Sequence, residues 1–442
     1  MKRFWLILLS LGLVMAFSVS AFAVDVKFSG EYYAAGLYLD KASIAETSNA
    51  NISTAFFTQR FRLGTDFIVS PCLKLVTRAD IMDRTWQPDA LATYQSSANT
   101  QDRNIDWDIA YIDYTSPIGL FRVGYMTDYS WGTIWGNRES GPTSGQIKYI
   151  LPIPNTPVTI VFDYAKEAEN SYWIENTSAV ASDRDYDSYR LGPIFNFKNA
   201  TIGGEAGVLF IFNNTHSYRG APLSATSYPF YQRTYVAQPY FKTNIGPVFL
   251  QGELSYAFGK RYSETSLVED HDVSSLTAWL DGDAKLGIFS IGGSLAYVQG
   301  QDPTSDKIQN AQTGGRDWDP CLIMYNNTVL NSWAGAVKGY SSESIDGEMT
   351  NAWFAQVRGS VTPIPQFTAG MSLSYARADQ DMGGDKEKGW EVDVTGTYKI
   401  TNNLSYMLGF GYYKAGDFYK NAVDSNNLSD DYLLINRLTL SF

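Results

Sequence analysis

Cysteine and histidine are scarce in this chain of 442 residues, which contains two of each. Cys72 and Cys321 belong to different predicted loops at opposite ends of the predicted strands, so we expect two free thiols and no disulfide. His216 and His271 also fall in predicted loops, with no nucleophile fixed nearby on a strand. We find no CxxC pair, no clustered metal ligands and no glycine-rich phosphate loop. The sequence therefore predicts a protein that has no catalytic residues and holds no metal or cofactor.

Long apolar runs are also missing, apart from one at the N-terminus. Met1-Lys2-Arg3 precedes an uncharged apolar stretch, residues 4–20, and Ala21-Phe22-Ala23 fits the small-x-small cleavage pattern. The apolar stretch is shorter than the ~20 residues of a membrane-spanning helix. We therefore expect a signal peptide over residues 1–23 and a mature chain over 24–442, and the lack of any later long run excludes a helical membrane protein.

Positive charge is the third shortage. The chain has 34 Lys and Arg against 46 Asp and Glu, which gives a net charge of −12. Loss of Lys2 and Arg3 with the signal peptide makes the mature chain more acidic still. Because nucleic-acid binding depends on a basic surface, this balance predicts no nucleic-acid partner.

Aromatic residues, by contrast, are abundant. They make up 15% of the chain, with 30 Tyr, while the mean hydropathy is only −0.21. Between residues 55 and 69, Phe57 and Phe61 fall on one face of a strand and Arg60 and Arg62 on the other. A modest mean hydropathy with apolar residues at every second position is typical of transmembrane barrels, whose strands meet lipid on one face only.

The alternating segments come in pairs, each joined by a short turn and separated from the next pair by a longer polar loop. We predict an all-β fold, a transmembrane antiparallel up-and-down barrel of about eighteen strands with short periplasmic turns and long extracellular loops. Pro193 and Pro239 fall inside two of these strands, where proline removes a ladder donor, so about sixteen strands is the alternative. The predicted strands are residues 26–40, 55–69, 73–84, 104–115, 120–129, 146–151, 158–166, 186–197, 201–212, 233–243, 248–259, 276–286, 289–299, 351–361, 367–376, 390–399, 404–414 and 432–442.

The last strand ends on a phenylalanine. An apolar strand at a free chain end is an aggregation hazard in a soluble domain. This ending resembles the C-terminal insertion signal of Gram-negative outer-membrane barrels, and the residues that carry the resemblance are Tyr432, Leu438, Leu440 and Phe442.

Charged residues at inward-facing positions form two groups along the chain. We interpret both groups as pore-lining, with a transverse electric field across a water-filled lumen between them. The alternative is that the wall is simply polar and that its charges are paired with neighbours. The basic group is Arg60, Arg62, Arg78, Arg122 and Arg190, and the acidic group is Glu205, Glu253, Asp281, Asp283, Glu391 and Asp393.

The signal peptide, the paired strands, the prolines in the short turns and Phe442 together resemble a Gram-negative outer-membrane porin. In trimeric general porins the third outer loop folds into the lumen and narrows it opposite an arginine cluster. By resemblance, residues 129–142 form this constriction loop, with Trp131, Trp135, Arg138 and Glu139 at the narrowing. The two tryptophans suggest either a sugar-binding track or anchors for the loop.

The resemblance implies an integral protein of the outer membrane, in contact with lipid and lipopolysaccharide and inserted by the outer-membrane assembly machinery. It implies a water-filled channel for diffusion of small hydrophilic solutes and ions, and assembly as a homotrimer. The alternatives are a wider eighteen-stranded substrate-selective channel, an alginate-type polysaccharide exporter, and an adhesive or structural surface barrel whose long loops, chiefly 300–350, bind a partner. From the acidic balance we expect weak cation preference.

Overall fold

The structure, a computed structural model, describes residues 24–86, 105–138, 143–169, 184–199, 201–216, 228–381 and 384–442. The predicted signal peptide and Glu139 lie outside the described residues. No helix in these ranges is both long enough and apolar enough to cross a membrane.

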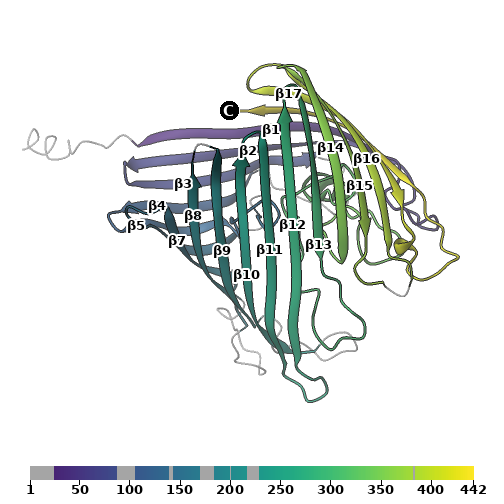
Figure 1. The fold of residues 1–442 in the computed structure, drawn as a ribbon, viewed down its shortest axis with the longest axis horizontal. Coiled ribbons are helices and arrows are strands. Elements are labelled where there is room, and N and C mark those ends of the chain that lie inside the picture. The colour runs from purple at the N-terminus through teal and green to yellow at the C-terminus, as the bar shows by residue number, and fades with distance from the viewer. Residues whose placement is uncertain are drawn as a thin grey trace, which may run out of the picture.

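The described chain forms one antiparallel sheet of eighteen strands that closes on itself (Figure 1), because β1 pairs with both β2 and β18. The prediction of an all-β barrel of about eighteen strands is confirmed. The strands are β1 (Asp25–Leu39), β2 (Thr54–Ser70), β3 (Leu73–Thr85), β4 (Ile105–Ser116), β5 (Gly119–Thr127), β6 (Thr143–Pro152), β7 (Val158–Ala168), β8 (Tyr186–Lys198), β9 (Ile202–Thr215), β10 (Phe230–Ile245), β11 (Val248–Ser263), β12 (His271–Leu286), β13 (Phe289–Val298), β14 (Ala352–Ile364), β15 (Phe367–Arg377), β16 (Glu387–Lys399), β17 (Leu404–Ala415) and β18 (Asp431–Ser441).

The two prolines interrupt their strands without ending them. Pro193 lies in β8, where the pairing with β9 resumes in the same register on its far side, and Pro239 lies in β10, which likewise keeps its register with β11. Each proline removes one backbone donor, and neither shifts the strands relative to each other. The sixteen-strand alternative is therefore wrong.

Short turns lie at one end of the barrel and long connections at the other, as the sequence predicts. The first and last strands meet at the short-turn end, where Gly30 N donates to Phe442 O at 2.9 Å and Phe442 N donates to Gly30 O at 3.0 Å. The last residue thus closes the ladder between the first and last strands and leaves no free edge there.

The outer surface of the barrel is apolar. Phe28, Trp107 and Val357 expose 62%, 61% and 64% of their surface. Large apolar side chains this exposed recur on almost every strand, which is the surface that a lipid-facing barrel presents.

The inner face is less polar than the alternation suggests. On β1 and β18 the inward side chains Leu37, Leu433 and Ile435 are almost fully buried. They belong to one large apolar cluster that also includes Trp333, a residue far from both strands in sequence. On this part of the wall, inward apolar side chains therefore pack against other apolar side chains that lie inside the barrel.

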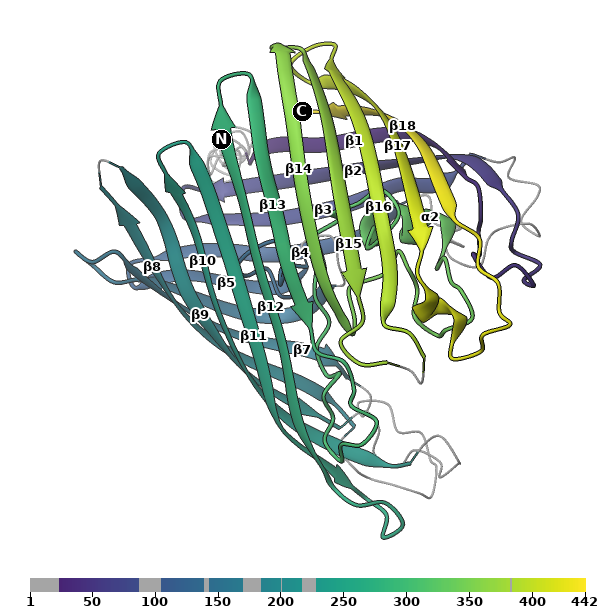
Figure 2. The ribbon, with the colours of Figure 1, turned by 45° about the vertical axis from the view of Figure 1, so that its right-hand side comes forward.

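The apolar side chains that pack on this part of the wall from inside come from residues 299–351, between β13 and β14. We call these residues the second inserted segment, because an earlier stretch of the chain, described below, also enters the lumen. The second inserted segment carries η2 (Asn327–Asn331) and α2 (Ser332–Ala334) and lies within the circuit of the strands (Figure 2). Residues 300–350 were predicted to form an outer loop, and this prediction is wrong, because apolar residues of the segment pack on the inner wall. A further short helix, η3 (Asp417–Lys420), precedes β18.

Trp333 tests whether the second inserted segment is held by this packing. Its ring is 1% exposed, and its Nε1 donates to the Tyr33 hydroxyl at 3.0 Å. We expect Trp333→Ala to cost about 3–5 kcal/mol and to loosen the segment from the wall. Limited trypsin digestion should then cleave at Lys338, inside the segment, faster than in the wild type. Trp353→Ala, which removes an outward-facing ring, is the control and should leave this cleavage rate unchanged.

Candidate functional site

A first segment also enters the lumen. We define the first inserted segment as residues 128–138, which follow β5. Trp135 is 1% exposed and packs against Trp279 of β12 and Trp318 of the second inserted segment, with ring centroids 6.1 and 5.2 Å apart. Trp131 meets Tyr240 of β10 edge-on at 5.7 Å. The buried Trp135 ring offers no free face to a sugar, so it serves as an anchor.

Glu253 on β11 fixes the backbone of the first inserted segment. Its Oε2 accepts hydrogen bonds from Thr133 N at 2.8 Å and from Thr133 Oγ1 at 2.7 Å, and its Oε1 accepts from Gln238. The side chain is only 4% exposed. The prediction that Glu253 lines a water-filled pore is therefore wrong, because its carboxylate is covered by the segment that it holds.

The two inserted segments bind each other. Gly315 N donates to Trp135 O at 3.1 Å, Asn137 Nδ2 donates to Asp317 Oδ2 at 2.8 Å, and Arg138 forms an ion pair with Glu348 at 3.2 Å. Together the two segments form one partition inside the barrel. It packs against the inner wall from β8, through β18, to β1. Residues 129–138, the described part of the predicted constriction loop, fold inward. The rest of the partition comes from the second inserted segment, which was predicted to lie outside.

The second inserted segment is held by Glu391 of β16. Its two oxygens accept hydrogen bonds from Ile323 N at 2.7 Å and from Met324 N at 2.6 Å. Glu391 is 0% exposed, and the neighbouring inward residue Asp393 is buried as well. Both were predicted to line the pore, and both instead lie beneath the segment.

Arg190 on β8 occupies a buried acidic pocket at the base of the first inserted segment. It forms ion pairs with Asp128 at 2.5 Å, with Asp163 at 3.2 Å and with Glu167. Its guanidinium stacks on the Tyr129 ring, 4.0 Å from the centroid. Arg190 was predicted to line the pore, but it is buried and positions the start of the segment.

The remaining basic residues lie on β2–β5, on the part of the wall that the contacts of the inserted segments leave uncovered. Their side chains are partly exposed. Each is paired with a carboxylate of a neighbouring strand, so these arginines do not form an uncompensated positive half of the wall. The pairs are Arg60–Asp83 at 2.8 Å, Arg62–Asp80 at 2.8 Å, Arg78–Asp108 at 2.7 Å and Arg122–Asp113 at 3.0 Å.

Three predicted acidic residues are also paired. Glu205 binds Lys242 at 2.8 Å, and Asp281 and Asp283 both bind Arg358 of β14. Asp281 is buried, whereas Glu205 and Asp283 keep about a third of their side-chain surface. Lys242 and Arg358 were not among the predicted site residues, although each lies at an inward position close to its partner strand and this spacing could have identified them.

Arg190→Ala would leave three carboxylates buried without their shared cation. Breaking a buried ion pair in this way typically costs about 3–5 kcal/mol. We expect this loss in the free energy of unfolding, measured by denaturant titration of the protein in lipid vesicles. Lys414→Ala, which breaks the exposed Lys414–Asp430 pair, should cost about 0–1 kcal/mol. Equal effects of the two substitutions would contradict the anchoring role of Arg190.

Asp346 gives the second inserted segment a pH dependence. The residue is fully buried, and burial raises the pKa of its carboxyl to about 7 against 3.8 for an ordinary aspartate, although Oδ1 accepts from Val337 N at 3.0 Å. Between these two values the folded protein holds a proton that the unfolded chain releases. Stability should therefore fall as the pH rises from about 4 to 7 and then level off.

Asp346→Asn removes this titration, so its free energy of unfolding should change less between pH 5 and pH 8 than that of the wild type. Denaturant titrations at the two pH values measure the difference. Asp417→Asn, at an exposed carboxylate of η3, is the control that should keep the wild-type slope. A variant slope equal to that of the wild type would show that Asp346 is not the titrating group.

Comparisons with known proteins agree with this architecture. No protein-family model matches the chain, and no curated protein matches it. Among solved structures, the outer membrane protein OpdK of Pseudomonas aeruginosa is 12% identical, with a TM-score of 0.54 over 94% of this chain and 99% of that one. OpdK has also been solved with vanillate.

Two further structures are similar over comparable lengths. A BenF-like porin from Pseudomonas fluorescens is 11% identical, with a TM-score of 0.53 over 94% of this chain and 99% of its own. OccAB1 of Acinetobacter baumannii is 13% identical, with a TM-score of 0.53 over 96% and 99% of the two chains. The chain therefore has the fold of these porin-like outer-membrane proteins, a closed barrel of eighteen strands.

Proposed function

We propose that this protein is an integral outer-membrane channel that passes small hydrophilic solutes and ions through a narrowed lumen. One observation carries the proposal. The two inserted segments cover the inner wall from β8 round to β1, while the wall of β2–β5 keeps charged, partly exposed side chains. A polar path beside a fixed partition suits solutes small enough to pass the gap.

The location follows from the outer surface. Large apolar side chains on nearly every strand suit a bilayer, and the similar folds belong to outer-membrane proteins. Leu440 and Phe442 project outward on the closing strand, where Phe442 lies 6.4 Å from the Phe61 ring. The predicted insertion signal, the assembly machinery that reads it and a homotrimer remain part of this proposal.

The narrowing favours a selective channel over a wide diffusion pore. OpdK was solved with vanillate, a small aromatic carboxylate, and a channel of this fold is thus able to hold a compact solute. Here the partly exposed Arg60, Arg62 and Arg122 would present guanidinium groups to a passing solute, and their partner carboxylates would limit the net attraction for anions.

The other two alternatives from the sequence have less support. The adhesive barrel relied on residues 300–350 as an outer binding loop, and this segment folds into the lumen instead. A polysaccharide exporter needs a wide path for a polymer, and the anchored partition narrows it. If the chain were an exporter, loss of its gene would leave polymer trapped in the periplasm.

Planar-bilayer recording tests the channel directly. Purified wild-type protein should give stepwise conductance increases. Glu253→Ala removes two charge-assisted hydrogen bonds to the first inserted segment, each worth about 1.5–3 kcal/mol, so its steps should be larger and noisier. Asp66→Ala, at a partly exposed carboxylate of β2 that pairs with Lys74, is the control and should keep quiet steps. A wild-type protein without conductance steps would overturn the proposal.

Ion preference can be measured in the same experiment. The acidic balance of the mature chain predicts weak cation preference in asymmetric salt. Because the basic residues on β2–β5 are paired with carboxylates, we expect a reversal potential close to zero and on the cation-selective side. An anion-selective value would place control of selectivity at the arginines instead of in the overall charge.

A further inference from the structure

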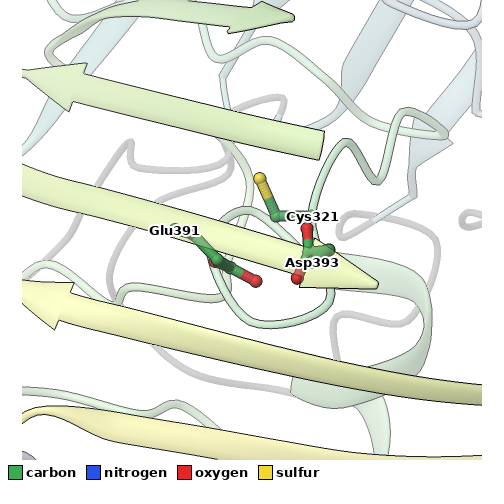
Figure 3. Close-up of side chains that lie close together, drawn as sticks. All are labelled: Cys321, Glu391 and Asp393. Atoms are coloured by element: carbon green, nitrogen blue, oxygen red, sulfur yellow. The ribbon is translucent and has the colours of Figure 1, made fainter. Parts of the chain in front are cut away.

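Three potential metal ligands from distant parts of the sequence meet beneath the second inserted segment. Cys321 comes from the segment itself, and Glu391 and Asp393 are neighbouring inward residues of β16 (Figure 3). One ligand atom from each residue lies within 4.8 Å of the other two. All three side chains are buried, with exposures of 4%, 0% and 5%. This cluster could not be predicted from the sequence, because Cys321 is far from Glu391 and Asp393 along the chain.

The two carboxylates bring like charges together in a site shielded from water, where uncompensated charge is costly. Two cationic side chains, Arg358 on β14 and Lys388 on β16 itself, are engaged with other carboxylates. Arg358 binds Asp281 at 2.7 Å, and Lys388 binds Glu343 at 2.6 Å. The pair therefore has no protein cation among the described residues that would balance its charge.

Asp393 has an oxygen with nothing to bind. Its Oδ2 accepts a hydrogen bond from Ser372 Oγ at 3.1 Å, but the buried Oδ1 has no hydrogen-bond partner. This oxygen and Glu391 Oε1 both lie close to the backbone of Gly411 on β17. A Cβ on Gly411 would lie 2.8 Å from Asp393 Oδ1 and 3.3 Å from Glu391 Oε1. Leu322 Cβ would lie 3.1 Å from the same Cβ, so a side chain at position 411 would crowd these groups and glycine leaves them room.

We propose that Cys321, Glu391 and Asp393 bind a divalent metal ion of the zinc type. A thiolate combined with carboxylate oxygens matches the borderline character of Zn²⁺, which takes both sulfur and oxygen ligands. Binding would release the Cys321 thiol proton and any proton shared by the carboxylates to solvent. The ion would balance the paired negative charges and satisfy Asp393 Oδ1.

An adjoining cavity of about 350 Å³ gives the ion a route to the site. Cys321 and Asp393 both line it, and so do Asp319 and the ion pair between Asp283 and Arg358, so its wall carries more acidic than basic groups. Because acidic walls concentrate cations, this cavity would draw a divalent ion toward the ligands. A bound ion would also tie the second inserted segment to β16, in addition to the two backbone hydrogen bonds that Glu391 accepts.

The test uses Co²⁺ as a spectroscopic probe and Zn²⁺ as a competitor on full-length, chelator-treated protein in detergent. Cys72→Ser leaves Cys321 as the only cysteine, without changing the site. We expect this variant to bind one Co²⁺ per chain, with a near-ultraviolet thiolate-to-metal band that Zn²⁺ abolishes. The band should be lost in Cys321→Ser, and Asp393→Asn should weaken binding about 10-fold or more, as loss of a ligand does at other metal sites.

Because Cys72→Ser does not alter the site, the result does not depend on whether the other variants fold. Absence of the band in folded Cys72→Ser protein would overturn the proposal and leave a carboxyl pair that shares a proton. Equal Zn²⁺ binding by wild type and Cys321→Ser would do the same. The proposal is independent of conductance, so a metal-binding protein without channel steps would contradict only the proposed function.

Discussion

Every backbone amide that enters the lumen of a wide barrel and leaves water must find an acceptor there. In this protein two buried glutamates on the wall accept three of these amides. Glu253 accepts from the backbone and side chain of Thr133, and Glu391 accepts from the amides of Ile323 and Met324. Because a carboxylate that accepts two such bonds compensates for its own burial, the same interaction fixes each inserted segment and makes an inward acidic residue tolerable.

These anchors divide the barrel wall into two parts. From β8 round to β1, many inward side chains are buried against the inserted segments, and several of them are apolar, such as Leu37, Trp279 and Ile435. On β2–β5 the inward side chains are arginines paired with aspartates, partly exposed. Inward side chains therefore pack against the inserted segments on one side of the barrel and face solvent on the other. The proposed solute path runs beside the partition and not through the centre of the barrel.

Alternation along each strand is a local property, and it was enough to predict the barrel, the strand count and the inward position of the charged residues. It was not enough to predict which groups those charged residues contact. Glu391 and Ile323 are 68 residues apart, and only the closed barrel brings them together. A sequence signal did exist on the first strand, where Tyr33, Ala35 and Leu37 are apolar opposite an apolar outer face, as in strands that are buried on both sides.

The claim on which the account depends is that the second inserted segment, not the barrel wall alone, limits the lumen. Single-channel conductance of a chain in which residues 311–349 are replaced by a short Gly-Ser linker tests it most directly, once folding is verified by strand content. Removing the buried core of the partition should increase the conductance several-fold over the intact chain. Conductance equal to that of the intact chain would show that the segment does not narrow the path and would contradict the claim.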